Sequence, residues 1–99
     1  MEEVEGQQID AGTGLRRAER AVRGDLPEET VLLNVDSGKA VRLNATGAWC
    51  WEKLTEPRAV GELADGLAQE FGVDSERALA DVRAFASDLF GRGLLEVEG

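Results

Sequence analysis

The stretch TVLLNVDSGKAVRLN, residues 30–44, decides how the chain is expected to fold. Its first part, residues 30–35, is rich in β-branched and aliphatic residues, and the DSG at 36–38 is typical turn sequence. Polar and apolar residues then alternate toward Leu43. The stretch therefore predicts a β-hairpin. We expect one face of this hairpin to close a small helical core, and the outer edge of its second strand to remain open to a peptide.

The hairpin also stands out by its charge. The chain of 99 residues has a formal net charge of −9. Residues 30–44, by contrast, contain two cations, Lys39 and Arg42, and one acid, Asp36, so this segment is net positive. One interpretation is that the two cations protect an edge strand from aggregation. A second, compatible interpretation is that they attract a peptide partner that carries carboxylates.

The segment before the hairpin divides into a tail and a third strand. Residues 1–14 show no apolar periodicity and contain three glycines, so we expect a flexible tail followed by one domain over residues 15–99. Residues 15–23, LRRAERAVR, fit a helical turn or a strand. We favour a strand near residues 20–25, because a two-stranded hairpin alone is only marginally stable.

Three helices are expected after the hairpin. The first spans about residues 46–54, with Asn44 as N-cap and Pro57 ending it. Its apolar stripe contains Ala48, Trp51 and Leu54, with Cys50 nearby, whereas Trp49 falls off it.

The second helix spans about residues 60–71 and ends at Gly72. Gly66 should destabilise it unless another group packs close to that position. The third helix starts after the N-cap Asp74 and continues to about residue 90, and a short strand follows at residues 94–97. The predicted core stripes of these helices are Val60, Leu63, Ala64, Leu67 and Phe71, and then Ala78, Val82, Phe85, Ala86 and Leu89.

This order of elements predicts the fold class. Strands followed by a run of helices favour an α+β domain, with the helices packed on one face of a small antiparallel sheet.

Composition excludes several function classes. The acidic balance disfavours nucleic acid and anionic membrane surfaces as partners. With no histidine and one cysteine, the chain cannot form an internal disulfide, a histidine-containing zinc finger or a Cys-His catalytic pair. No apolar run is long enough to span a bilayer, and the acidic N-terminus is unlike a signal peptide, so we expect a cytoplasmic protein.

No catalytic constellation is recognisable. The sequence lacks a calcium-loop pattern and a phosphate-binding loop, and Cys50 lies between two tryptophans, where a thiol usually serves as inert packing. We therefore expect no catalytic residue, no metal and no cofactor, and favour a binding module over an enzyme.

One ordered set of motifs resembles a known family. It consists of GKAVRLN at 38–44, WEKL at 51–54, RAVGEL at 58–63, DVRAF at 81–85 with Leu89, and GLL at 93–95. Over about residues 20–97 the chain resembles the PqqD-like proteins, the RiPP recognition elements that act on ribosomally made, post-translationally modified peptides. The resemblance implies a winged-helix-like fold, with a three-stranded antiparallel sheet followed by three helices. This sequence differs from the family at Ala59, where a capping Ser or Thr is usual before the helix that contains Glu62.

The resemblance also implies a site. In this family the leader segment of a precursor peptide adds as a strand to the third strand and lies beside the third helix. Carried onto this sequence, the implied peptide-binding residues are Lys39, Ala40, Val41, Arg42, Leu43 and Asn44 on the strand, and Asp81, Ala84, Phe85 and Asp88 on the helix. Val41, Leu43 and Phe85 either form an apolar slot for the leader or fill the core; for Phe85 we favour the core.

Partners and alternatives follow from the same resemblance. A stand-alone domain of this size resembles the leader-binding subunit of lasso-peptide systems, which works beside a separate leader peptidase and a cyclase. Stand-alone members also serve quinone-cofactor and radical-enzyme pathways. A winged-helix DNA-binding regulator is disfavoured by the acidic third helix, and a small hydrolase or redox enzyme by the missing nucleophile partners. An open strand edge could also pair with itself into a weak homodimer.

Overall fold

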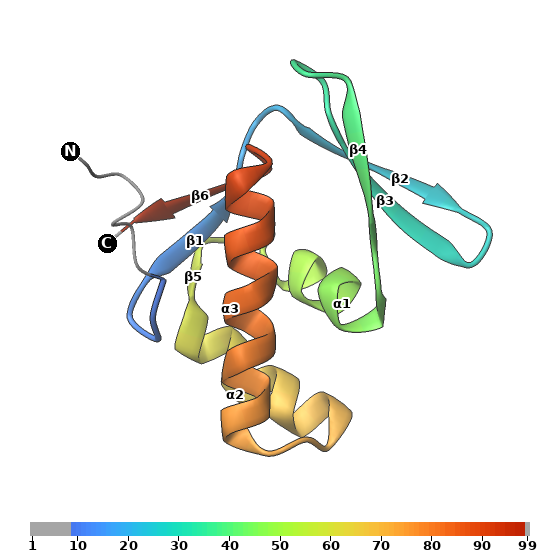
Figure 1. Ribbon diagram of the computed structural model, residues 1–99. Coiled ribbons are helices and arrows are strands. Elements are labelled where there is room, and N and C mark those ends of the chain that lie inside the picture. The colour runs from blue at the N-terminus through green and yellow to red at the C-terminus, as the bar shows by residue number, and fades with distance from the viewer. Residues whose placement is uncertain (1–8, 99) are drawn as a thin grey trace.

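The computed structural model describes residues 9–98, which form three helices and six short strands (Figure 1). The elements in chain order are β1 (Gly14–Arg17), β2 (Ala21–Leu26), β3 (Glu29–Asn34), β4 (Lys39–Leu43), α1 (Ala45–Lys53), β5 (Arg58–Ala59), α2 (Val60–Phe71), α3 (Ser75–Gly91) and β6 (Leu95–Glu98). None of the helices in this part of the chain has the length and apolarity needed to cross a membrane.

The strands form two antiparallel three-stranded sheets. The wing sheet, in the order β2-β3-β4, contains the predicted hairpin and projects from the helices (Figure 1). The body sheet, in the order β5-β1-β6, joins the beginning, middle and end of the described chain. The α+β prediction is confirmed, and β2 is the third strand expected near residues 20–25. The helical alternative for residues 15–23 is wrong, and the body sheet was not predicted.

The body sheet buries its short strands against the helices. Leu15 of β1 is 1% exposed and Leu95 of β6 is 2% exposed. Arg17 extends from β1 to α1, where its Nη2 donates to the carbonyl of Trp51 and its guanidinium lies 4.6 Å from the centre of the Trp51 ring. Burial lowers the pKa of Arg17. These contacts attach the strands to the helices more firmly than their length suggests.

Part of the expected tail is packed onto α2. Ile9 and Thr13 are buried, and the carbonyls of Ala11 and Thr13 accept hydrogen bonds of 2.9 Å from the amides of Gly61 and Val60. The structure thus differs from the expectation of a loose segment for residues 9–14. The remainder of that prediction, residues 1–8, lies outside the described residues.

Those carbonyls explain how α2 begins without a capping side chain. Ala59 occupies the N-cap position, and Glu62 accepts a 3.0 Å hydrogen bond from its amide, as half a capping box would. The loop at residues 11–13 satisfies the next two amides. By contrast, α1 and α3 use the predicted caps, because Asn44 and Asp74 accept from the amides of Gly47 and Arg77.

The helices largely show the predicted core stripes, with differences at Phe71 in α2 and at Ala48 in α1. Phe71, the last residue of α2, is 38% exposed, and its ring forms a T-shaped pair with Trp49, with ring centres 6.2 Å apart. A Cβ atom on Gly66 would lie 2.9 Å from the Trp49 ring, so glycine is required by this close approach. In α1, Ala48 is only half-buried, whereas Gly47 and Cys50 face inward.

Candidate peptide-binding groove

The outer edge of β4 is unpaired among the described strands. β4 pairs with β3 alone, in a register that places Lys39 opposite Asn34 and Val41 opposite Leu32. On the other side of β3, the amide of Val35 donates to the carbonyl of Arg20 at 2.9 Å. Bonded and non-bonded pairs alternate along an antiparallel ladder, so the odd-numbered residues of β3 bond to β2 and its even-numbered residues to β4.

This alternation decides which backbone groups are available. Lys39, Val41 and Leu43 lie opposite even-numbered residues of β3 and bond inward. Ala40 and Arg42 therefore direct their amides and carbonyls to the open edge. The side chains follow the opposite pattern: Val41 and Leu43 are half-buried on the side of the sheet that faces the core, whereas Ala40 and Arg42 are exposed.

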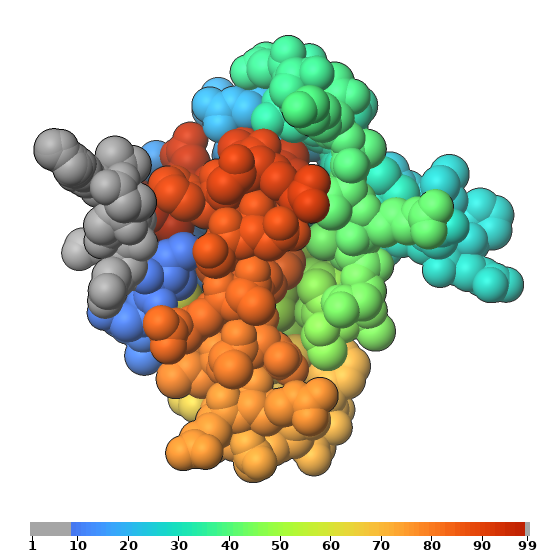
Figure 2. Space-filling model, viewed as in Figure 1, coloured from blue at the N-terminus to red at the C-terminus, as the bar shows by residue number. Residues whose placement is uncertain are grey.

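A groove lies between this edge and α3. In the space-filling view, α3 in orange to red and β4 in green lie beside each other on the visible face of the molecule (Figure 2). Two pockets follow one another along the groove, and both have walls from the β4 region and from α3.

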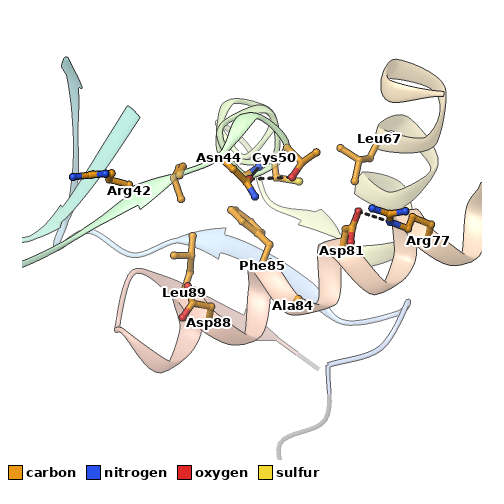
Figure 3. Close-up of a pocket in the computed structure, with 13 residues that line it drawn as sticks. Arg42, Asn44, Cys50, Leu67, Arg77, Asp81, Ala84, Phe85, Asp88 and Leu89 are labelled. Carbon is orange, nitrogen blue, oxygen red and sulfur yellow. Dashed lines mark hydrogen bonds and ion pairs between the residues drawn. The ribbon is translucent and has the colours of Figure 1, made fainter. Parts of the chain in front are cut away.

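The larger pocket, called here the α1 pocket, has a volume of about 590 Å³. Its apolar lining comes from four elements and includes Leu43 of β4. Cys50 of α1, Leu67 of α2 and Phe85 of α3 line the same pocket (Figure 3). The other lining residues are Arg42, Asn44, Thr46, Gly47, Arg77, Asp81, Ala84, Asp88 and Leu89. An extended peptide on β4 would have an apolar recess beneath it here.

Three charged residues of the α1 pocket lie on α3, and the fourth, Arg42 of β4, lies 3.0 Å from Glu29. Asp81 lies 3.8 Å from Arg77, and Asp88 lies 3.0 Å from Arg92, each pair one helical turn apart. Cys50 is buried, and that burial, with a smaller effect from Asp81, raises the pKa of its thiol to about 12. The thiol is therefore protonated at neutral pH and forms part of the apolar lining.

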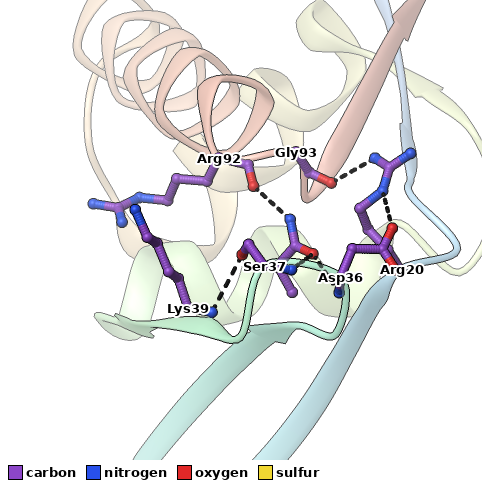
Figure 4. A network of polar contacts seen from close by, with 7 residues as sticks. Arg20, Asp36, Ser37, Lys39, Arg92 and Gly93 are labelled. Carbon is purple, nitrogen blue, oxygen red and sulfur yellow. Dashed lines mark hydrogen bonds and ion pairs between the residues drawn. The ribbon is translucent and has the colours of Figure 1, made fainter.

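The smaller pocket, called here the turn pocket, has a volume of about 320 Å³ and lies beside the turn between β3 and β4. It is lined by Asn34, Ser37, Lys39, Ala40, Val41, Gly91, Arg92 and Leu94. Lys39 and Arg92, both drawn in Figure 4, are among these lining residues.

The side chain of Asn34 links the turn between β3 and β4 to the residue that follows α3. Its side-chain nitrogen donates to the carbonyl of Arg92 at 2.9 Å, and its oxygen accepts from the amides of Asp36 and Ser37 (Figure 4). Arg20 adds a second attachment, donating to the carbonyl of Gly93 at 2.9 Å.

The conformation of Gly93 permits this approach. Gly93 has a φ of +76°, and a Cβ atom there would lie 3.0 Å from the Asn34 nitrogen. Asn34 and Arg20 therefore hold the wing sheet against the end of α3, and so hold β4 beside the helix.

The structure brings all ten of the predicted site residues to this groove. Lys39, Ala40 and Val41 line the turn pocket, and Arg42, Leu43, Asn44, Asp81, Ala84, Phe85 and Asp88 line the α1 pocket. Phe85 is half-buried: it packs against the core and also borders the pocket. Their role in binding stays a prediction.

Sequence reasoning missed other lining residues. Leu89 lies one turn after Phe85 on α3, and Arg92, the C-cap of α3, lies one turn after Asp88, so helical spacing from the predicted residues would have found them. Cys50 and Leu67 come from α1 and α2, and only the tertiary packing brings them here. No group of three or more potential metal ligands occurs within residues 9–98.

An unpaired strand edge beside a helix, with pockets between them, defines a domain suited to bind an extended peptide by strand addition. Comparison with known sequences agrees with the predicted family: the model of coenzyme PQQ synthesis protein D (PqqD) matches residues 29–95. The chain belongs to the PqqD family, as the resemblance implied. A search among curated proteins gave no match.

Two solved structures are similar to this chain. TbiB1, solved in complex with the TbiA(beta) leader peptide, is 30% identical, with a TM-score of 0.74 over 82% of this chain and 94% of that one. Lasso peptide synthetase B1, complexed with the leader peptide, is 24% identical, with a TM-score of 0.74 over 83% of this chain and 96% of that one. The second likeness concerns the fold.

Proposed function

We propose that this protein is a non-catalytic RiPP recognition element that binds the leader segment of a ribosomally made precursor peptide. The leader adds as a strand to the open edge of β4 and lies in the groove beside α3. The observation that carries this proposal is the unpaired edge of β4 facing two pockets. The complex of the similar TbiB1 with a leader peptide supports it.

The groove offers the two kinds of contact that such binding needs. The amides and carbonyls of Ala40 and Arg42 provide sequence-independent hydrogen bonds, and the apolar lining of the α1 pocket provides an anchor for a leader side chain. Both are needed, because a disordered leader loses conformational entropy when it binds.

We further propose that the bound leader is presented to a separate leader peptidase, as in lasso-peptide maturation. The face of the wing sheet that points away from α3 supports this step. Val22 and Leu33, cross-strand neighbours on that face, are 48% and 37% exposed, and Leu26 is 55% exposed. A leader strand on β4 would extend this apolar face, so a peptidase could contact leader and wing together without entering the groove.

A chaperone in a quinone-cofactor pathway is the second candidate. It is favoured by the match to the PqqD family, whereas the lasso-peptide candidate is favoured by the resemblance of a domain of this size to the leader-binding subunit of lasso-peptide systems. Both candidates use the same edge of β4 and differ in the enzyme that receives the leader. Pull-down with a lasso leader peptidase, or with the radical enzyme of a quinone pathway, in the presence of leader would separate them.

The strand-addition step is tested by proline substitution with a matched control. Ala40→Pro removes an outward amide of β4, whereas Asp25→Pro removes an outward amide on the opposite edge of the same sheet. Fluorescence polarisation would use the labelled TbiA(beta) leader peptide and peptides selected from a random library on the wild-type protein. We expect Ala40→Pro to weaken binding at least about tenfold and Asp25→Pro to leave it unchanged.

Circular dichroism would establish that both variants are folded. A folded Ala40→Pro variant with wild-type affinity would contradict strand addition to β4. Binding of duplex DNA at moderate salt would instead favour the regulator alternative.

A further inference from the structure

The turn pocket contains a cation that forms no ion pair with residues 9–98. Lys39 is exposed at the rim of this pocket, and none of the carboxylates in residues 9–98 lies within 4.0 Å of its ammonium group. The neighbouring cations are already paired: Arg92 lies 3.0 Å from Asp88, and Arg20 lies 3.3 Å from Asp36.

Strand addition would place a guest side chain directly beside this lysine. The backbone amides and carbonyls of Ala40 and Arg42 face the open edge. If the guest peptide runs antiparallel to β4, its residues opposite Lys39, Val41 and Leu43 would therefore form non-hydrogen-bonded pairs with β4. In such pairs the side chains on one face come closest together. A residue opposite Lys39 would thus share its face and its pocket, and oppositely charged cross-strand pairs are stabilising.

The same register gives apolar neighbours to the next two positions. Val41 and Leu43 are half-buried against the core, and Leu43 borders the α1 pocket. The protein therefore offers the guest two apolar positions followed by a cationic one, spaced two residues apart on the face toward α3.

We propose that the turn pocket binds a carboxylate side chain of the bound peptide. Two residues away, opposite Val41, the peptide carries an apolar side chain, and four residues away, opposite Leu43, it carries another. In an antiparallel guest, the acidic residue lies toward the C-terminal end of this motif, because β4 runs from Lys39 to Leu43. The motif is then apolar-x-apolar-x-Asp/Glu. This inference rests on the proposed function and adds the chemistry that the pocket selects.

The test is a selection of random 14-residue peptides on the wild-type protein, all with amidated C-termini so that only side-chain carboxylates can occupy the pocket. We expect the selected peptides to contain the motif. Replacing its acid by the corresponding amide should weaken binding about fivefold, the effect of a favourable cross-strand charge pair.

Charge reversal locates the contact. Lys39→Glu should weaken binding of the acidic peptide and restore binding to the same peptide with lysine at the acidic position. Lys53→Glu is the matched control: it changes the net charge equally, but Lys53 lies over the Trp49 ring, outside the groove residues. It should change neither affinity by more than about twofold.

The outcomes separate this inference from the proposed function. If Ala40→Pro abolishes binding but the acid-to-amide change has no effect, or Lys39→Glu and Lys53→Glu behave alike, the carboxylate subsite is wrong and strand addition stands. If Ala40→Pro leaves the selected peptides bound, strand addition itself is wrong.

Discussion

The two sheets of this protein differ in what holds them. The body sheet has strands of two to four residues, yet Leu15 and Leu95 are almost completely buried. The wing sheet has strands of five or six residues, yet Leu32 and Asn34 are its only fully buried side chains among the described residues. Burial against the helices, rather than strand length, should therefore decide how much each sheet contributes to stability.

The difference has a functional consequence. Because the body sheet and the helices contain most of the core, the wing can leave the outer edge of β4 unpaired and one apolar face exposed. The attachment of the wing at Asn34 and Arg20 then determines where that edge lies relative to α3.

The largest expected effect tests the two sheets against each other with the same substitution. Leu15→Ala in the body sheet should lower the free energy of unfolding by about 3 kcal/mol, because a buried leucine leaves a cavity. Leu33→Ala in the wing, where the side chain is 37% exposed, should cost less than about 1 kcal/mol. Urea denaturation measures both. Equal losses would show that the wing is as important to stability as the body.

The second prediction concerns the attachment of the wing. Asn34→Ala leaves the carbonyl of Arg92 and two turn amides without their partner, and should cost about 2 kcal/mol. Amide hydrogen exchange in β3 and β4 should accelerate more than in β1 and β6. Ser37→Ala in the same turn removes one exposed hydrogen bond and serves as the control. Uniform acceleration across both sheets would contradict a local role for Asn34.

The wing was predictable from sequence and the body sheet was not. Residues 30–44 combine alternation with a turn signal, and both are local properties. β1 is only GLRR, too short to show a period, and its partners β5 and β6 lie about forty and about eighty residues away in the chain. Likewise, the loop at residues 11–13 was assigned to a tail because its function as a cap depends on the distant start of α2.

The candidate site, like the sheets, could be predicted only where local sequence patterns determine it. The residues on β4 and α3 came from one strand pattern and one helical stripe, together with the family resemblance. Cys50 and Leu67 were missed as pocket residues because their place depends on how α1 and α2 pack. The register of β4 also required the structure: the hydrogen bond from the amide of Val35 to the carbonyl of Arg20 shows that Ala40 and Arg42 direct their backbone groups to the open edge.

The third prediction uses pH to probe the junction of the wing and the helices. The Cys50 thiol has a pKa of about 12 in the folded protein, against an ordinary value of 9.0. The folded state therefore binds the proton more tightly, and this stabilisation, complete below pH 9, is lost as the pH rises toward 12. Between pH 8 and pH 10 the free energy of unfolding should fall by about 1.4 kcal/mol.

The control for this prediction is Cys50→Ala, which should remove that slope whatever its own stability. The chain has no tyrosine and two lysines, so few other groups titrate in this range. An unchanged slope in Cys50→Ala would assign the pH dependence to another group.

The smallest expected effect concerns the start of α2, where the body sheet meets the helices. Ala59→Ser supplies the capping hydroxyl that the family usually has, and reconstructs the capping box with Glu62. Because Ala11 and Thr13 already satisfy the first amides of α2, the gain should be about 0.5 kcal/mol, below the usual value for a cap. Thermal denaturation of Ala59→Ser measures it, with Ala59→Gly as control. A gain well above 1 kcal/mol would mean that the loop at residues 11–13 does not cap α2 in solution, and that the body sheet is less firmly attached than its burial indicates.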